Sequence, residues 1–324
     1  IDTQAPSSTL DIPSDYYNEA GFIADTPIQG TTTDEHSGLS TVEISIQNLD
    51  NSAYYNGSTW VDDEQWVIAE GTTSWSYNLE TSQLNDGAFY MVRPRGTDAV
   101  GNVETSYDGD SFTYDTTEPN SVLSIVNDFY SMDSWNSTDQ IQGTAADDAS
   151  GIAEVNVLIQ RGSDGFYYDS EGWSAIETWQ TVDGTDIWSY ALSHDMLDDA
   201  VSYTVSTRAT DTAGNLETSF AADGFIYDTT VPSSAVLIDQ EFYSNLSWIA
   251  AASISGTAAD SGSGISTLEI AINNSADNSW WSGTQWTSQE TWLISNETST
   301  WSYSFNSVSM TDGVTYTVIS LDTT

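Results

Sequence analysis

Alternating hydrophobic and polar residues mark several segments of the chain as β-strands. In residues 41–47, Val42, Ile44 and Ile46 alternate with polar side chains, and residues 153–159 and 267–273 repeat the pattern. Successive side chains of a strand point to opposite faces, so such a segment buries one face and exposes the other to water. The pattern therefore predicts half-buried strands.

Turn signals separate about seven such strands in each stretch of roughly 110 residues. They include the Asn-Gly pair at Asn56 and the Asp-Gly pairs at Asp86 and Asp312. No segment has a sustained 3.6-residue apolar stripe with helix caps. Seven short antiparallel strands in this length are typical of an immunoglobulin-type β-sandwich, so we expect an all-β fold.

The sequence repeats with a period of 113 residues. Asp2, Asp115 and Asp228 lie at this spacing and open three matching segments. Glycine and tryptophan columns keep the same register: Gly30, Gly143 and Gly256; Gly38, Gly151 and Gly264; Trp60, Trp173 and Trp286; Trp66, Trp179 and Trp292; Trp75, Trp188 and Trp301. A fixed period of this size indicates tandem domains. We expect three immunoglobulin-like domains in a linear array, at residues 1–114, 115–227 and 228–324.

The third repeat is shorter than the other two. It has 98 residues, and the missing part matches residues 101–115 of the first repeat, which contain the strand-like segment SFTYD. We therefore expect the third domain to lack its final strand. Because proteins protect exposed sheet edges, we expect the chain to continue beyond Thr324; strand donation by another molecule is the alternative.

The charge of the chain restricts its partners. There are 49 acidic and 4 basic residues, a formal net charge of −45, and all four basic residues are arginine. Nucleic acids and anionic membranes bind through Lys and Arg, so these partners are excluded. So acidic a surface favours divalent cations or a saline environment, and composition does not separate the two.

Acidic residues recur at three positions of the repeat, in loops expected at the domain ends. They are Asp115 and Asp228 in the linkers, Asp34, Asp147 and Asp260 after the second strand, and Asp98 and Asp211 in a TDxxGN loop. Calcium takes six to eight oxygen ligands, and loops of adjacent domains that converge on a linker could supply them. The alternative is that these aspartates form turns by accepting hydrogen bonds from their own backbone.

Two arginines and the tryptophans each allow more than one interpretation. Arg95 and Arg208 are one period apart, and the simplest role for them is an ion pair that holds a loop. Exposed tryptophans could stack on sugars, but a fixed register in every repeat favours packing. Trp280 and Trp281 stand outside the shared tryptophan columns, so they are the better candidates for exposed ligand contacts.

Other site signals are weak. Five N-x-Ser/Thr sequons occur, about the number expected by chance, so glycosylation is only a possible modification; they begin at Asn56, Asn136, Asn245, Asn273 and Asn296. There is no Cys, and the two histidines occupy unmatched repeat positions. No nucleophile, zinc-protease or phosphate-loop motif is present. We therefore expect no enzymatic activity.

The repeat motifs resemble a known group of proteins. The runs YDTTxPSS and GTAADxxSGI, and the segment YTVSTRATDTAGN at residues 203–215, are similar to immunoglobulin-like repeats of long bacterial and archaeal surface proteins. That group includes adhesin stalks, S-layer components and other extracellular arrays. The resemblance covers the whole chain and implies an extracellular or cell-surface location.

Two functional hypotheses follow. The first is a structural segment of a stalk, S-layer or filament, whose partners are other copies of the chain or further immunoglobulin-like repeats. The second is an adhesion module that binds glycans or a protein. No apolar run approaches the roughly 18 residues that span a bilayer, so we expect no membrane insertion in this segment.

Overall fold

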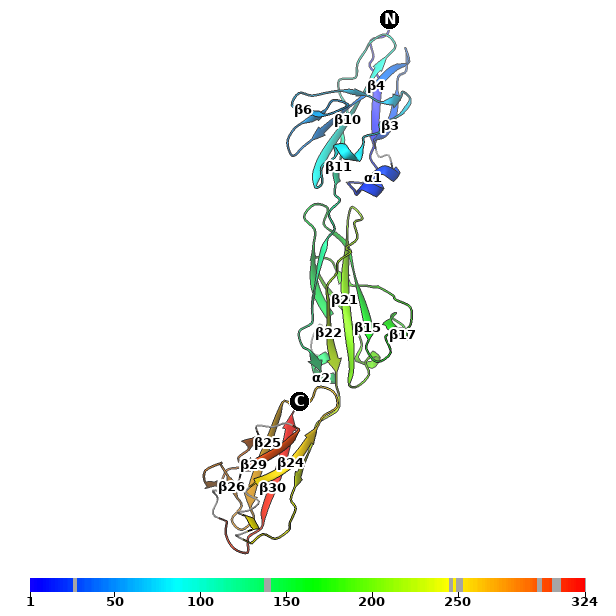
Figure 1. Ribbon diagram of the computed structural model, residues 1–324. Coiled ribbons are helices and arrows are strands. Elements are labelled where there is room, and N and C mark those ends of the chain that lie inside the picture. The colour runs from blue at the N-terminus through cyan, green and yellow to red at the C-terminus, as the bar shows by residue number, and fades with distance from the viewer. Residues whose placement is uncertain are drawn as a thin grey trace.

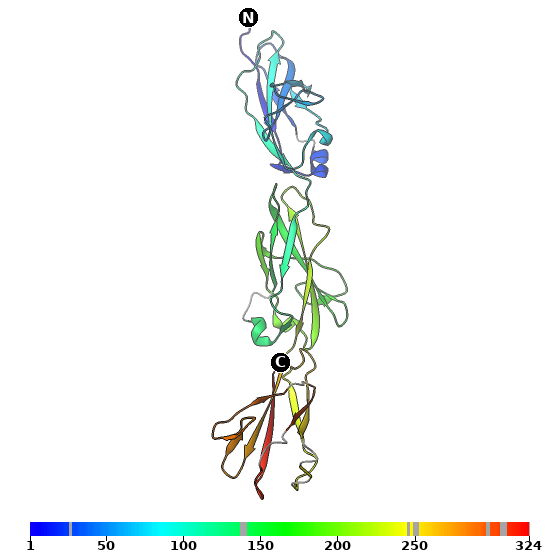
Figure 2. The same cartoon turned by 60° about the vertical axis from the view of Figure 1, so that its left-hand side comes forward.

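Three β-sandwich domains follow one another end to end in an elongated arrangement (Figures 1 and 2). The computed structural model describes residues 1–25, 28–136, 141–244, 247–248, 253–295, 299–304 and 310–323. The strands of the three sandwiches run from Ser7 to Tyr114, from Asn120 to Tyr227 and from Ser233 to Thr323. The prediction of an all-β chain of tandem immunoglobulin-like sandwiches in a linear array is confirmed.

Two sheets form the first domain. The smaller has the order β1-β3-β9-β8, and the larger has the order β2-β11-β10-β4-β5-β6 with β7 also paired to β4. The strands of the smaller sheet are β1 (Ser7–Asp11), β3 (Gln29–Thr33), β8 (Glu70–Gly71) and β9 (Ser74–Ser76). Those of the larger sheet are β2 (Tyr16–Tyr17), β4 (Leu39–Asn48), β5 (Tyr54–Tyr55), β6 (Trp60–Val61), β7 (Val67–Ile68), β10 (Ala88–Asp98) and β11 (Asp110–Tyr114).

The second domain repeats this topology. Its sheets have the orders β12-β14-β20-β19 and β13-β22-β21-β15-β16-β17, with β18 paired to β15. The strands of the smaller sheet are β12 (Asn120–Ser124), β14 (Ile141–Ala146), β19 (Asp183–Gly184) and β20 (Ile187–Tyr190). Those of the larger sheet are β13 (Phe129–Tyr130), β15 (Ile152–Arg161), β16 (Tyr167–Tyr168), β17 (Trp173–Ser174), β18 (Gln180–Thr181), β21 (Val201–Asp211) and β22 (Ala222–Tyr227).

The third domain has a smaller set of described strands. One sheet has the order β23-β24-β29, and the other has the order β27-β26-β25-β28 with β30 paired to β25. The strands are β23 (Ser233–Leu237), β24 (Ser253–Ala259), β25 (Thr267–Asn274), β26 (Ser279–Trp281), β27 (Trp286–Thr287), β28 (Leu293–Ile294), β29 (Thr300–Ser304) and β30 (Tyr316–Thr323). Among the described strands β30 pairs with β25 alone, whereas β10 pairs with both β4 and β11.

Short elements depart from the simple antiparallel pattern. The helices α1 (Glu19–Asp25) and α2 (Met132–Asn136) bury Phe22 and Trp135, and two single 3₁₀ turns cover residues 81–83 and 194–196. In addition, β2 and β13 pair in parallel with β11 and β22. Helices of two turns or fewer are too short to produce an apolar stripe, so the sequence pattern did not indicate them.

A tryptophan packed on a glycine holds the smaller sheet of each domain to the core. Trp75, Trp188 and Trp301 are almost fully buried. A Cβ atom added to Gly143 would lie 2.4 Å from the Trp188 ring and 2.0 Å from a backbone oxygen of Val122. No other residue fits under that ring, which explains why the glycine and tryptophan columns occur together.

A buried glutamate ties the first strand of each of the first two domains to the larger sheet. Glu217 is 4% exposed; its carboxylate accepts hydrogen bonds from the Ser121 N–H (3.0 Å), the Ser121 hydroxyl (2.6 Å) and the Ala209 N–H (3.0 Å). Glu104 is its equivalent in the first domain, where it accepts from two backbone N–H groups. No helix of the described residues is both long and apolar enough to cross a membrane.

Candidate metal sites at the domain ends

Two groups of three carboxylates lie at the N-terminal ends of the first and second domains. In each group the three residues offer oxygen atoms that all lie within 4.8 Å of one another; the groups are Asp2, Asp34 and Asp98, and Asp115, Asp147 and Asp211. Five of these six residues were expected at a site, and the structure brings them together. Asp2 was not singled out as a ligand, although its register with Asp115 contained the signal.

Strand ends position the three members of the second group. Asp211 is the last residue of β21, and Asp147 directly follows β14. Asp115 directly follows β11, the last strand of the first domain. Asp115 and Asp211 are buried, at 0% and 1% exposure, and Asp147 is half-buried. All three belong to the linker or to the second domain. Loops of the first domain do not contribute a carboxylate to this group, so convergence of loops from both domains is not the geometry observed.

The same aspartates also form turns, as the alternative interpretation proposed. One oxygen of Asp147, Oδ1, accepts hydrogen bonds from the N–H groups of Ala149 (3.0 Å), Ser150 (2.8 Å) and Gly151 (3.1 Å). Asp211 accepts from the backbone and side-chain nitrogens of Asn215, at 2.8 and 2.7 Å. The two interpretations are compatible, because the turn hydrogen bonds fix the carboxylates in place.

The carboxylates of each group lie close enough to repel one another. None of the ion pairs in the described part of the chain involves them. Burial raises the pKa of Asp115, and the charges of Asp147 and Asp211 raise it further, against the hydrogen bond from Ser150. In the first group, burial also acts to raise the pKa of Asp98, but hydrogen bonds from Asn102 outweigh it and lower the value to about 2. Asp98 is therefore held as the anion.

The geometry and chemistry of the groups fit a calcium ion. Calcium binds oxygen ligands at about 2.3–2.6 Å, so two ligands on opposite sides of the ion are about 4.6–5.2 Å apart. Three carboxylate oxygens within 4.8 Å of one another can therefore surround one ion. In the first group the Oδ2 atom of Asp2 is buried and accepts no hydrogen bond from a described residue, which leaves it available as a ligand.

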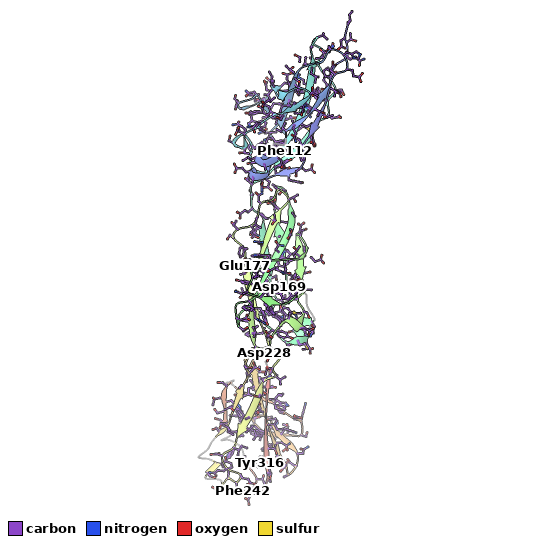
Figure 3. All side chains as sticks on the ribbon, turned by 90° about the vertical axis from the view of Figure 1, so that its right-hand side faces the viewer. Phe112, Asp169, Glu177, Asp228, Phe242 and Tyr316 are labelled. Atoms are coloured by element: carbon purple, nitrogen blue, oxygen red, sulfur yellow. The ribbon has the colours of Figure 1, made fainter. Side chains whose placement is uncertain are left out.

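The third domain keeps two of the three positions. Figure 3 places Asp228 at the junction of the second and third domains, where its Oδ2 accepts hydrogen bonds from the Ser263 N–H and hydroxyl, both at 2.6 Å. Asp260 forms the expected turn through Oδ1, while its buried Oδ2 has no hydrogen-bond partner in the part of the chain that the structure describes. The residue in register with Asp98 and Asp211 is Thr324, which lies outside the described residues.

The structure corrects the expectation for Trp281. This residue is 5% exposed, packs in the core of the third domain and donates a hydrogen bond to the Tyr303 hydroxyl. It occupies the column of the core residues Tyr55 and Tyr168, so an aromatic column had been overlooked because its members differ in type. An exposed contact is thereby excluded for Trp281, while Trp280 is half-buried.

The other tryptophan columns have two different roles. Those of Trp60, Trp173 and Trp286 pack against the cores, as expected. Trp66 and Trp179 instead lie under arginine side chains, with the guanidinium carbons of Arg95 and Arg208 at 4.0 and 4.1 Å from the ring centres. These contacts are cation–π interactions.

The ion pair expected for the two arginines forms in one domain. Arg95 binds Glu43 on the neighbouring strand at 2.9 Å. Arg208 faces Asn156 instead and forms no ion pair with a described residue. In both domains the arginine stacks on a tryptophan, so that contact, and not a loop-holding ion pair, is the shared feature.

The sequons lie in different surroundings. Asn56 and Asn136 are exposed, and Asn56 accepts the hydrogen bonds of a tight turn. Asn273 is half-buried within β25, where its amide donates to Ser279. Asn245 and Asn296 lie outside the described residues. Glycosylation stays a prediction for these sites.

Solved structures similar to this chain include three that are described as adhesins or adhesion proteins. One concerns host cell surface retention of a 1.5-MDa bacterial ice-binding adhesin; it has 16% identity and a TM-score of 0.39, with 100% of this chain and 98% of that chain covered. A second is a Ca²⁺-stabilized adhesin that helps an Antarctic bacterium bind ice, with 13% identity, a TM-score of 0.31 and coverage of 100% and 74%.

The third is a tetra-tandem repeat in the extending region of a large adhesion protein, with 18% identity, a TM-score of 0.29 and coverage of 99% and 74%. At these scores no residue of this chain is equated with a residue of those proteins. No protein-family model matches the sequence, and no curated protein is similar to it in sequence.

Proposed function

We propose that the chain is a structural spacer of an extracellular or cell-surface protein, in which calcium stiffens the junctions between immunoglobulin-like domains. The domains correspond to residues 1–114, 115–227 and 228–324. A stalk segment fits best, because similar domains that follow one another end to end separate what lies at the two ends. The role is mechanical and not catalytic.

The observation that carries the proposal is the position of Asp115. It directly follows β11, the last strand of the first domain, yet its carboxylate belongs to the acidic group of the second domain. An ion bound there would fasten the linker to the second domain. It would also neutralise three carboxylates that otherwise repel one another in a poorly solvated place.

The second hypothesis, a glycan-binding module, loses its main support. It depended on an exposed Trp280–Trp281 pair, and Trp281 is a core residue. In the first two domains, Trp75 and Trp188 are buried and Trp66 and Trp179 lie under arginines. Trp60 and Trp173 are half-buried and pack against the cores. The spacer is therefore the function we propose.

Calorimetric titration of the full chain with calcium tests the proposal, at fixed ionic strength so that general screening stays constant. The wild-type chain should bind calcium, and Asp211→Asn should remove one site while leaving the site of the first domain. Asp183→Asn, an exposed change of the same charge on β19, is the matched control and should bind like the wild type. Absence of calcium binding by the wild-type chain would overturn the proposal.

A further inference from the structure

The linkers are also held by the domains that precede them, through one aspartate at each junction. Asp86 lies in the loop before β10 and contacts the linker that follows the first domain. Its Oδ1 accepts hydrogen bonds from the Thr116 N–H (2.6 Å) and hydroxyl (2.9 Å), and its Oδ2 accepts one from the Thr117 hydroxyl (2.6 Å). Both carboxylate oxygens are therefore engaged by the linker.

The second junction repeats this arrangement. Asp199, one period after Asp86, accepts hydrogen bonds from the Thr229 N–H (2.6 Å) and hydroxyl (2.9 Å). It also accepts from the Thr230 N–H (3.2 Å) and hydroxyl (2.5 Å). The threonine hydroxyl of Thr230 lowers the pKa of Asp199, with further lowering from Thr229. The carboxylate is thus held in its charged form, in which hydrogen bonds are strongest.

The residue after each aspartate shapes the loop. Gly87 and Ala200 have positive φ angles of 72° and 59°, and the Gly87 N–H donates to the Tyr114 carbonyl at 2.8 Å. The adjoining strand is anchored as well, because the Tyr90 and Tyr203 hydroxyls accept hydrogen bonds from the loop backbone at 2.7 Å. The aspartates are therefore presented to the linkers by rigid loops.

We propose that Asp86 and Asp199 are carboxylate latches that make each linker a fixed extension of the domain before it. The proposed cation site joins the other side of the linker to the following domain. The role of the latch rests on the proposed spacer function. The latch itself needs no metal, because every group that binds its carboxylate is a hydrogen-bond donor of the protein. Full stiffness of a junction requires both attachments.

The two junctions differ on the side of the following domain. At the first junction Glu118 accepts hydrogen bonds from the Thr218 N–H (2.9 Å) and hydroxyl (2.8 Å) of the second domain. The residue in register with Glu118 at the second junction is Val231, which is 81% exposed and has no side-chain acceptor. We therefore expect the second junction to bend more than the first.

Spin-label distance measurements on the full chain test the latch. The sequence has no cysteine, so Cys introduced at the exposed positions Thr59, Ala175 and Ser288 gives selective labelling of one site in each domain. The pair at 59 and 175 reports on the first junction, and the pair at 175 and 288 reports on the second. Each pair is measured with calcium and with a chelator.

Loss of a latch should broaden the distances across its own junction only. Asp86→Ala, and the double change Thr116→Val with Thr117→Val that keeps the charge, should broaden the 59–175 distribution in calcium and in chelator. Asp199→Ala should broaden the 175–288 distribution. Asp312→Ala alters the corresponding aspartate of the third domain, which forms no hydrogen bond with a described residue of either linker, and should change neither distribution.

The outcomes separate the latch from the cation site. Unchanged distributions in Asp86→Ala and Asp199→Ala would overturn the latch, whatever calcium does. If the wild-type distance distributions are the same in calcium and in chelator, but the latch variants have broader distributions than the wild type, the result counts against the cation site alone. If the wild-type 175–288 distribution is as narrow as the 59–175 distribution, the expected effect of having Val231 in place of Glu118 is contradicted.

Discussion

Replacement of Glu217 by glutamine should weaken the second domain strongly. The carboxylate of Glu217 accepts three hydrogen bonds in a buried place, two of them at Oε2 from the Ser121 hydroxyl and the Ala209 N–H. Glutamine has nearly the same shape, but its NH₂ group is a donor. Whichever way the amide is turned, at least one donor of the protein loses its acceptor and faces another donor.

The size of the effect follows from the number of bonds lost. A buried donor left without a partner costs about 1–3 kcal/mol, and hydrogen bonds to a charged group contribute about 1.5–3 kcal/mol. We therefore expect a loss of about 2–4 kcal/mol in the free energy of unfolding. For a domain of this size, 1 kcal/mol shifts the melting temperature by roughly 3–5 °C, so the expected shift is on the order of 10 °C.

Calorimetric melting of the full chain measures this shift, and hydrogen exchange at the Ser121 and Ala209 amides assigns it to the second domain. Glu171→Gln, at an exposed position, is the control for the loss of one charge. Glu104→Gln should have a similar effect on the first domain. If Glu217→Gln melts like Glu171→Gln, the buried carboxylate does not stabilise the contact between the sheets and the reasoning fails.

Four further predictions concern packing, pH, salt and the third domain. Gly143→Ala should prevent normal packing of Trp188, seen as a lower melting temperature and a red-shifted tryptophan emission, whereas Gly172→Ala, which meets no atom within 4 Å, should not. In chelator, the free energy of unfolding should rise as the pH falls from 7 towards the raised pKa of Asp115, because burial and neighbouring charges disfavour its anion in the folded state. Calcium should abolish this rise. Urea titrations at each pH, with calcium and with chelator, measure both effects. Melting temperatures should increase between 0.1 and 1 M sodium chloride. Over this range the Debye length falls from about 10 to about 3 Å, so the salt screens the repulsion within a net charge of −45. A melting temperature that does not change with salt would contradict this. The third domain should be cleaved first in limited proteolysis of the full chain, because β30 pairs with a strand on one side only among the described strands, and equal resistance of all three domains would oppose this view.

The sequence predicted the architecture because the repeat imposes the same physical requirements three times. Period-two alternation in residues 41–47 and its two counterparts gave the central strands, which are β4, β15 and β25. The glycine and tryptophan columns are explained by one packing requirement, the close approach of Trp188 to Gly143. Short features such as α1 and the parallel pair of β2 with β11 were not predicted, because two to seven residues are too few for a periodic pattern.

The sequence predicted most of the residues of the candidate site, but not how they are arranged. Recurrence in register identified Asp115, Asp147 and Asp211, and the structure brings their oxygens together. All three belong to the linker or the second domain. This grouping depends on where the strands end in space, and the spacing of the residues along the sequence does not reveal it. The error at Trp281 arose because tyrosine and tryptophan were treated as different columns, although both fill the same core position.

The latch aspartates show why a turn signal can hide a contact. Asp86 was interpreted only as the first half of an Asp-Gly turn, and it does begin that turn. Its hydrogen bonds to Thr116 and Thr117 span about 30 residues of sequence and join the first domain to the linker. Both halves of the contact recur one period later, as Asp199 with Thr229 and Thr230, and that paired recurrence was the available signal.

The central claim is that calcium stiffens the spacer, and small-angle X-ray scattering of the full chain with and without calcium tests it most directly. At constant ionic strength, calcium should give a scattering profile of a single extended rod with the largest maximum dimension. A chelator should shorten the average maximum dimension and broaden the distance distribution, and Asp115→Asn should remove most of the response at the first junction. Identical profiles in calcium and in chelator would contradict the account.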